Sequence, residues 1–85
     1  MISNIEEAVL AIQNSKYNKS IITEKREGFI GEEHFYGFYM TNNQAFSYGQ
    51  VDPFGFGLLI SEKGTIDCLS DTMSMSLLDI LQKAQ

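Results

Sequence analysis

The chain has 85 residues, of which 44% are hydrophobic, and a formal net charge of −5. A domain of this length buries only about 60–65% of the surface of its unfolded chain, so its core must be small. The acidic balance, with no basic cluster beyond Lys25-Arg26, disfavours direct binding to nucleic acid, which requires a cationic surface.

The chemistry-bearing residue types are few. Cys68 is the single cysteine and His34 the single histidine, so an intramolecular disulfide is impossible and a Cys/His zinc site is not predicted. No apolar stretch approaches the roughly 20 residues of a membrane span, and the first residues are acidic where a signal peptide is basic. We therefore expect one cytoplasmic domain, residues 1–85, with no cofactor, no metal and no contact with a membrane.

The chain begins with a predicted helix. Ser3 is the expected N-cap, and Glu6 completes a capping box. The helix is expected to end near residue 15, where asparagine and serine lower the helical propensity. Its apolar stripe has helical spacing and consists of Ile5, Ala8, Val9 and Ile12.

Strand patterns follow the helix, with turn residues between them. Asn42-Asn43 suits a two-residue hairpin turn, and Asp52-Pro53-Phe54-Gly55 has the residues of a β-turn. The segments that predict strands by alternation and aromatic content are 20–30, 34–40, 44–51, 56–60 and 65–69.

A second helix is predicted at the C-terminus. Ser70 or Asp71 would cap it, and its apolar stripe would comprise Met73, Leu77, Ile80, Leu81 and Ala84. The order α-β-β-β-β-β-α with short links predicts an α+β fold. We expect an antiparallel meander of four to five strands, flanked by the N-terminal and C-terminal helices on one face of the sheet.

The glycine-rich segment "DPFGFG" raises the question of a phosphate site. Such a loop binds phosphate when it begins a helix, whose free N–H groups then point at the anion. Gly55-Phe56-Gly57 leads instead into a predicted strand. The segment is therefore interpreted as a bent corner where glycine permits a close backbone approach.

Aromatic residues are concentrated in the middle of the chain, since nine of the ten lie between Phe29 and Phe56. Two helices on one face would leave rings exposed on the other, and an exposed aromatic patch commonly marks a binding surface. The alternative is a twisted sheet that wraps around its own rings. The expected partner-binding residues are the rings Tyr36, Phe38, Tyr48 and Phe54 and the carboxylates Glu24, Glu27, Glu32, Glu33 and Asp52.

Four residues receive structural interpretations. Glu32, Glu33 and His34 are expected in a solvated loop, because a lone histidine is a poor metal site. Cys68 is expected to be a buried strand thiol, because free cysteine behaves as a small hydrophobic residue. Without a visible nucleophile and base, an enzyme is not predicted.

Size, acidity and aromatic content together favour a small cytoplasmic protein that binds another protein with a basic surface and blocks it. Immunity proteins, antitoxins and phage-encoded inhibitors of host defences are of this type. One alternative is a ligand-binding or regulatory module, in dimeric form, whose aromatic face closes over a small molecule. Another is a structural homodimer in which two open sheet faces pair.

Overall fold

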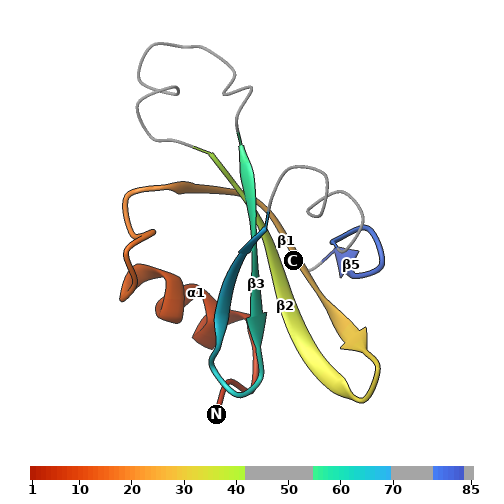
Figure 1. Ribbon diagram of the computed structural model, residues 1–85. Coiled ribbons are helices and arrows are strands. Elements are labelled where there is room, and N and C mark those ends of the chain that lie inside the picture. Colours follow the sequence, from red (N-terminus) through yellow and green to blue (C-terminus); the bar gives the residue numbers. More distant parts are fainter. Residues whose placement is uncertain (42–54, 70–77, 84–85) are drawn as a thin grey trace.

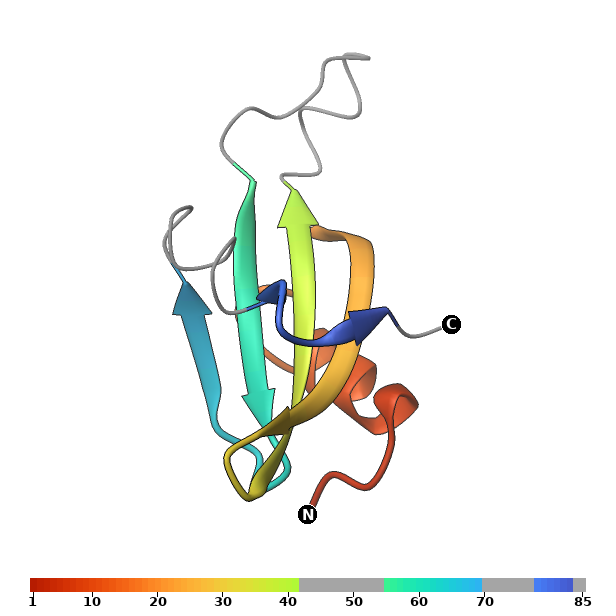
Figure 2. The ribbon, with the colours of Figure 1, turned by 90° about the vertical axis from the view of Figure 1, so that its right-hand side faces the viewer.

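The computed structural model describes residues 1–41, 55–69 and 78–83, which form one helix and a five-stranded sheet of order β4-β3-β2-β1-β5. The first four strands make an antiparallel meander, and the very short β5 pairs with the free edge of β1 (Figure 2). The α+β class and an antiparallel meander agree with expectation, but β2 pairs directly with β3, where strand 44–51 was expected to follow β2. That segment and the predicted Asn42-Asn43 turn lie outside the described residues. The elements are α1 (Ile5–Gln13), β1 (Ile21–Ile30), β2 (Glu33–Thr41), β3 (Phe56–Ser61), β4 (Ile66–Leu69) and β5 (Gln82–Lys83).

Helix α1 begins one residue later than the capping box predicted. The N-cap is Asn4, whose Oδ1 accepts a hydrogen bond from the Glu7 amide at 2.9 Å. Glu7 reaches back, and its Oε1 accepts from the backbone N and the Oγ of Ser3 at 3.2 and 2.9 Å. The helix ends at Gln13, with Asn14 as its C-cap. Ile5, Ala8 and Ile12 lie on the side of the helix that faces the sheet, where all three are buried.

Removing this cap tests the helix start. Asn4→Ala leaves the Glu7 amide without its acceptor, and we expect a loss of about 1 kcal/mol in the free energy of unfolding. Urea denaturation followed by circular dichroism measures it. Asn18→Ala is the control, because Asn18 is exposed beyond the helix and makes only a backbone hydrogen bond among the described residues. Equal stability of the two variants would show that Asn4 does not cap α1.

The β1–β2 hairpin has a two-residue connection, Gly31-Glu32, in which Gly31 adopts a φ of 66°. Glycine adopts positive φ at no steric cost, so it allows this two-residue turn, and the turn length fixes the register of the hairpin. Phe29 is consequently opposite His34, and Glu27 is opposite Tyr36. The predicted strand 34–40 is confirmed, whereas the solvated loop expected at Glu33 and His34 is wrong, because β2 begins at Glu33.

One face of the sheet packs against α1. The side chains of Tyr36, Phe38 and Met40 alternate along β2 and all point toward this helix, as the strand period predicted. They join Ile5, Ala8, Ile12, Leu58 and Ile60 in the larger core.

The opposite face is covered as well, by the C-terminal segment (residues 78–83), so that the sheet lies between this segment and α1 (Figure 1). Leu78 and Leu81 are buried there against Leu59 and Leu69. The expectation of two helices on one sheet face is thus wrong for the described residues. The predicted helix does not continue to residue 84, since Gln82–Lys83 form β5; residues 70–77 lie outside the described part.

Two features let the C-terminal segment approach the sheet closely. Gly37 has no side chain, and a Cβ there would overlap Leu78 Cδ2 and lie 2.9 Å from Leu81 Cδ1. Arg26 secures the segment from β1, because its Nη1 donates to the carbonyl oxygens of Leu78 at 2.9 Å and Leu81 at 3.4 Å. A mostly buried guanidinium bonded in this way contributes both packing and charge-assisted hydrogen bonds.

The glycine-rich corner is described only from Gly55 onward. A Cβ at Gly55 would lie 3.0 Å from the carbonyl oxygen of Met40, so the expected close backbone approach is confirmed there. The predicted turn at residues 52–54 is outside the described part. Among the described helical residues, no helix has the length and apolar character needed to cross a bilayer.

Candidate functional site

Of the four aromatic residues proposed as anchors, the two that the structure describes do not form an exposed patch. Tyr36 and Phe38 are only 3% and 0% exposed, because α1 packs on the face to which both side chains point. Their predicted role as exposed anchors is therefore wrong. Tyr48 and Phe54, together with the carboxylate of Asp52, lie outside the described residues. Phe29, which was not among the predicted anchors, is the exposed phenylalanine within the described part of the chain, at 67%.

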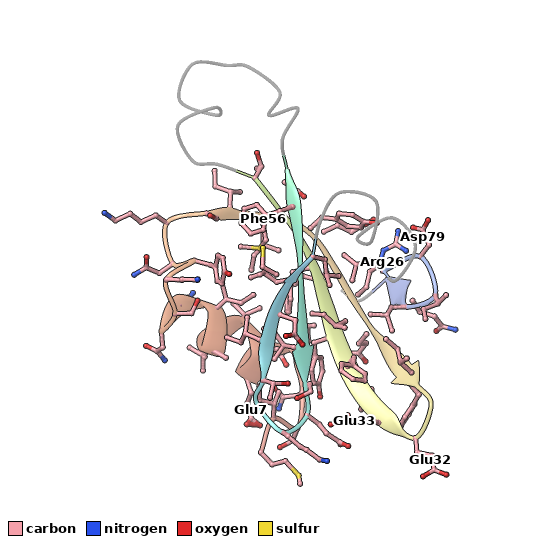
Figure 3. The ribbon with its side chains drawn as sticks, in the orientation of Figure 1. Glu7, Arg26, Glu32, Glu33, Phe56 and Asp79 are labelled. Carbon is pink, nitrogen blue, oxygen red and sulfur yellow. The ribbon has the colours of Figure 1, made fainter. Side chains whose placement is uncertain are left out.

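The predicted carboxylates separate into two groups. Glu24 is on the face covered by the C-terminal segment, where its Oε2 is 3.0 Å from Nε of Arg26. Glu27 is on the other face, paired across the strands with Tyr36. Glu32 is exposed at the tip of the hairpin, and Glu33 begins β2 beside it (Figure 3). Glu27, Glu32 and Glu33 are all nearer the hairpin end of the sheet than Glu24, but strand alternation puts Glu33 on the same face as Glu24.

An open hollow of about 510 Å³ lies at this end, between the start of α1 and the β1–β2 hairpin. Four separate parts of the chain line it: the N-terminal residues 2–6, β1, β2 and the β3–β4 turn. We call it the acidic hollow, and its charged and aromatic side chains are Glu6, Glu27, Phe29, His34, Tyr36 and Glu62.

Backbone hydrogen bonds hold these parts together. The amide of Ile2 donates to the carbonyl oxygen of Glu62 at 2.8 Å, which fixes the N-terminal residues to the β3–β4 turn. The amide of Glu62 in turn donates to the carbonyl oxygen of His34 at 3.0 Å. The rim of the hollow is therefore tied to the sheet by main-chain contacts and does not depend on side-chain positions alone.

Three of the rings that line the hollow form a row. The His34 ring lies 4.8 Å from the Phe29 ring, edge to face, and 4.8 Å from the Tyr36 ring, tilted. Such aromatic pairs stabilise each other beyond the area they bury. The row runs from the exposed Phe29 to the buried Tyr36, so the exposed apolar area decreases along it.

The electrostatic character of the hollow is negative. Burial raises the pKa of the Tyr36 hydroxyl above its usual value, and the negative charges of Glu27, Glu7 and Glu62 raise it further. Glu7 is engaged in the helix cap, whereas Glu6, Glu27 and Glu62 form no salt bridge within the described residues. The described lining contains no lysine or arginine. A concave site with this charge attracts cations.

Other reactive groups lie elsewhere or are scattered. Cys68 is exposed on the edge strand β4, so the expected buried thiol is wrong. Across residues 1–41, 55–69 and 78–83, no three metal-ligating side chains are grouped in a way that could hold a metal ion.

Glu6, Glu62 and Phe29 were missed because they come from three distant parts of the chain and share no spacing motif. A signal did exist for one of them. If Gly31-Glu32 is taken as the two-residue turn, the register places Phe29 beside His34 and Glu27 beside Tyr36.

Comparison with known proteins gives no match: no protein-family model fits this chain, and no curated protein or solved structure matches it significantly. The acidic hollow and its exposed ring are therefore the features on which a function can be proposed.

Proposed function

We propose that this protein acts by binding another protein through a basic region of that partner, and that binding blocks the partner. Immunity proteins, antitoxins and phage-encoded anti-defence proteins work in this manner. The observation that carries the proposal is the concentration of unpaired carboxylates around an exposed phenylalanine at one end of the sheet. Charge of one sign steers a complementary partner, and an aromatic ring supplies contact area once it is desolvated.

The geometry gives less support to the two alternatives. A small apolar molecule would have to lie among the carboxylates of an open hollow. Binding there would remove water from these charged groups, which is unfavourable. A homodimer in which two open sheet faces pair would need an uncovered face. In one chain, α1 packs on one face and the C-terminal segment on the other. Catalysis is not part of the proposal.

The test compares two charge reversals of equal size. Glu32→Lys alters the exposed hairpin tip beside the acidic hollow, and Asp67→Lys alters the exposed edge strand β4. Each changes the formal net charge of −5 by the same amount. A partner is first captured from the native host on the wild-type protein, and its association with both variants is then measured by surface plasmon resonance.

We expect Glu32→Lys to slow association about tenfold at low salt, with the difference shrinking as salt is added. Asp67→Lys should associate nearly as fast as the wild type. The wild-type protein should also inhibit the partner's own activity. Equal association rates for the two variants, or binding without inhibition, would contradict the proposal.

A further inference from the structure

The hydroxyl of Tyr36 has an unusual environment. Tyr36 is only 3% exposed, yet its hydroxyl makes no hydrogen bond to another described residue. No described side-chain oxygen is both fully enclosed and without a partner. The Tyr36 hydroxyl must therefore reach the space of the acidic hollow that its side chain lines, where it has room for a hydrogen-bond partner from outside the described residues.

Carboxylates surround this hydroxyl from both neighbouring strands. Glu27 is its cross-strand neighbour on β1, while Glu62 follows β3, the strand on the other side of β2. Both charges act on the Tyr36 hydroxyl. Glu6 lines the same hollow from the start of α1. The described lining of this hollow contains several carboxylates and no lysine or arginine, while Lys25 lies with Glu6 in a neighbouring hollow.

We propose that the acidic hollow binds the guanidinium group of an arginine side chain presented by the partner protein, an inference that rests on the proposed function. Guanidinium carries five N–H donors in a planar arrangement, which suits several acceptors placed around it, and it stacks on aromatic rings. The exposed Phe29 ring provides such a surface at the open side. Guanidinium is also more weakly hydrated than the ammonium of lysine, so it enters a half-enclosed site at a lower cost.

The experiment uses small probes with the whole 85-residue protein and needs no identified partner. N-acetyl-arginine methylamide is titrated into the ¹⁵N-labelled protein, and backbone amide shifts are followed by NMR. The citrulline analogue has nearly the same shape without the charge, and the lysine analogue has the charge without the planar group. We expect saturable shifts at Glu27, His34 and Glu62 with the arginine probe, at about millimolar affinity.

The lysine probe should bind several-fold more weakly, and the citrulline probe should cause no saturable shift. Glu27→Gln should weaken the arginine probe about tenfold, and Glu62→Gln provides the same test at a turn position should the first variant fold poorly. Tyr36→Phe keeps the buried ring, removes only the hydroxyl and should weaken binding by a smaller factor. Glu24→Gln is the control, because Glu24 lies on the opposite face, and it should leave the affinity unchanged.

Three results would overturn the inference: no saturable shift with the arginine probe, equal binding of the arginine and citrulline probes, or lysine binding as tight as arginine. Each is distinguishable from failure of the proposed function. A partner that binds and is slowed by Glu32→Lys, while the arginine probe fails, refutes the guanidinium site alone. An arginine probe that binds while no partner is inhibited refutes the proposed function alone.

Discussion

Phe38→Ala is expected to lower the free energy of unfolding by about 3–5 kcal/mol, the loss typical of a deleted core phenylalanine. Phe38 is fully buried between α1 and the centre of the sheet, and its removal leaves a cavity that helix and strands can fill only in part. At about 0.05–0.15 kcal/mol per residue, a domain of this size has only about 4–13 kcal/mol in total. The loss is therefore a large share of the total, and the variant should unfold at a much lower urea concentration than the wild type. Equilibrium urea denaturation followed by circular dichroism measures the change.

Phe29→Ala is the matched control for this experiment. The chemical change is the same, and both rings lie on the face of the sheet that carries α1, but Phe29 is 67% exposed. Its replacement should cost no more than about 0.5–1 kcal/mol, most of it from the lost contact with His34. If the two variants lose similar stability, the assignment of Phe38 to the core and of Phe29 to the surface is wrong.

Gly37→Ala is expected to loosen the C-terminal segment from the sheet and to cost about 1–3 kcal/mol, as overpacking does. The added methyl group would overlap Leu78 Cδ2, and because Leu78 is fully buried it has little free space into which to move. In most strand interiors the same substitution is favourable, since alanine loses less backbone entropy than glycine. A loss of stability is thus diagnostic of the close approach. Hydrogen exchange at the amides that pair Arg26 with Lys83 measures the loosening.

A double-mutant cycle separates this clash from other effects. Leu78→Ala alone should cost about 2–5 kcal/mol, because a fully buried leucine is truncated. In that background Gly37→Ala should cost little or nothing, since the nearest opposing atom is gone and only the end of Leu81 remains close. Gly28→Ala, whose Cβ would be 3.2 Å from Leu81 Cδ2, should have a milder effect. Additive losses for Gly37 and Leu78 would show that the two sites do not touch.

Local pattern predicted the α+β class and an antiparallel meander, but not the direct pairing of β2 with β3. Because side chains alternate along a strand, the sequence of β2 places Phe35 and Tyr39 on one face and Tyr36, Phe38 and Met40 on the other, as the structure shows. Gly31 and Gly64 have positive φ in the β1–β2 and β3–β4 connections, which is the conformation that glycine favours in turns. These features depend on residues that are close together in the sequence, so they can be predicted from a single sequence.

The cover on the second face could not be predicted in the same way. Leu77 and Leu81 fit the stripe of a helix, but the contact that decides the outcome is between Leu78 and Gly37, far apart in the chain. Gly37 has no side chain, so the hydrophobic pattern of β2 does not indicate that another segment packs against this position. The acidic hollow was missed for a similar reason, since Glu6, Glu27 and Glu62 become neighbours only when the N-terminal residues bond to the β3–β4 turn.

Hydroxyl-radical footprinting of the side chains tests most directly whether both faces of the sheet are covered while the hairpin end stays open. Comparison within one residue type removes differences in intrinsic reactivity. Leu10, at 55% exposure, should be oxidised much faster than Leu81 at 3%, and Phe29 at 67% much faster than Phe38 at 0%. Oxidation of Leu78 and Leu81 at the rate of Leu10 would mean that the C-terminal segment leaves the sheet open, and a protected Phe29 would remove the exposed ring from the proposed binding surface.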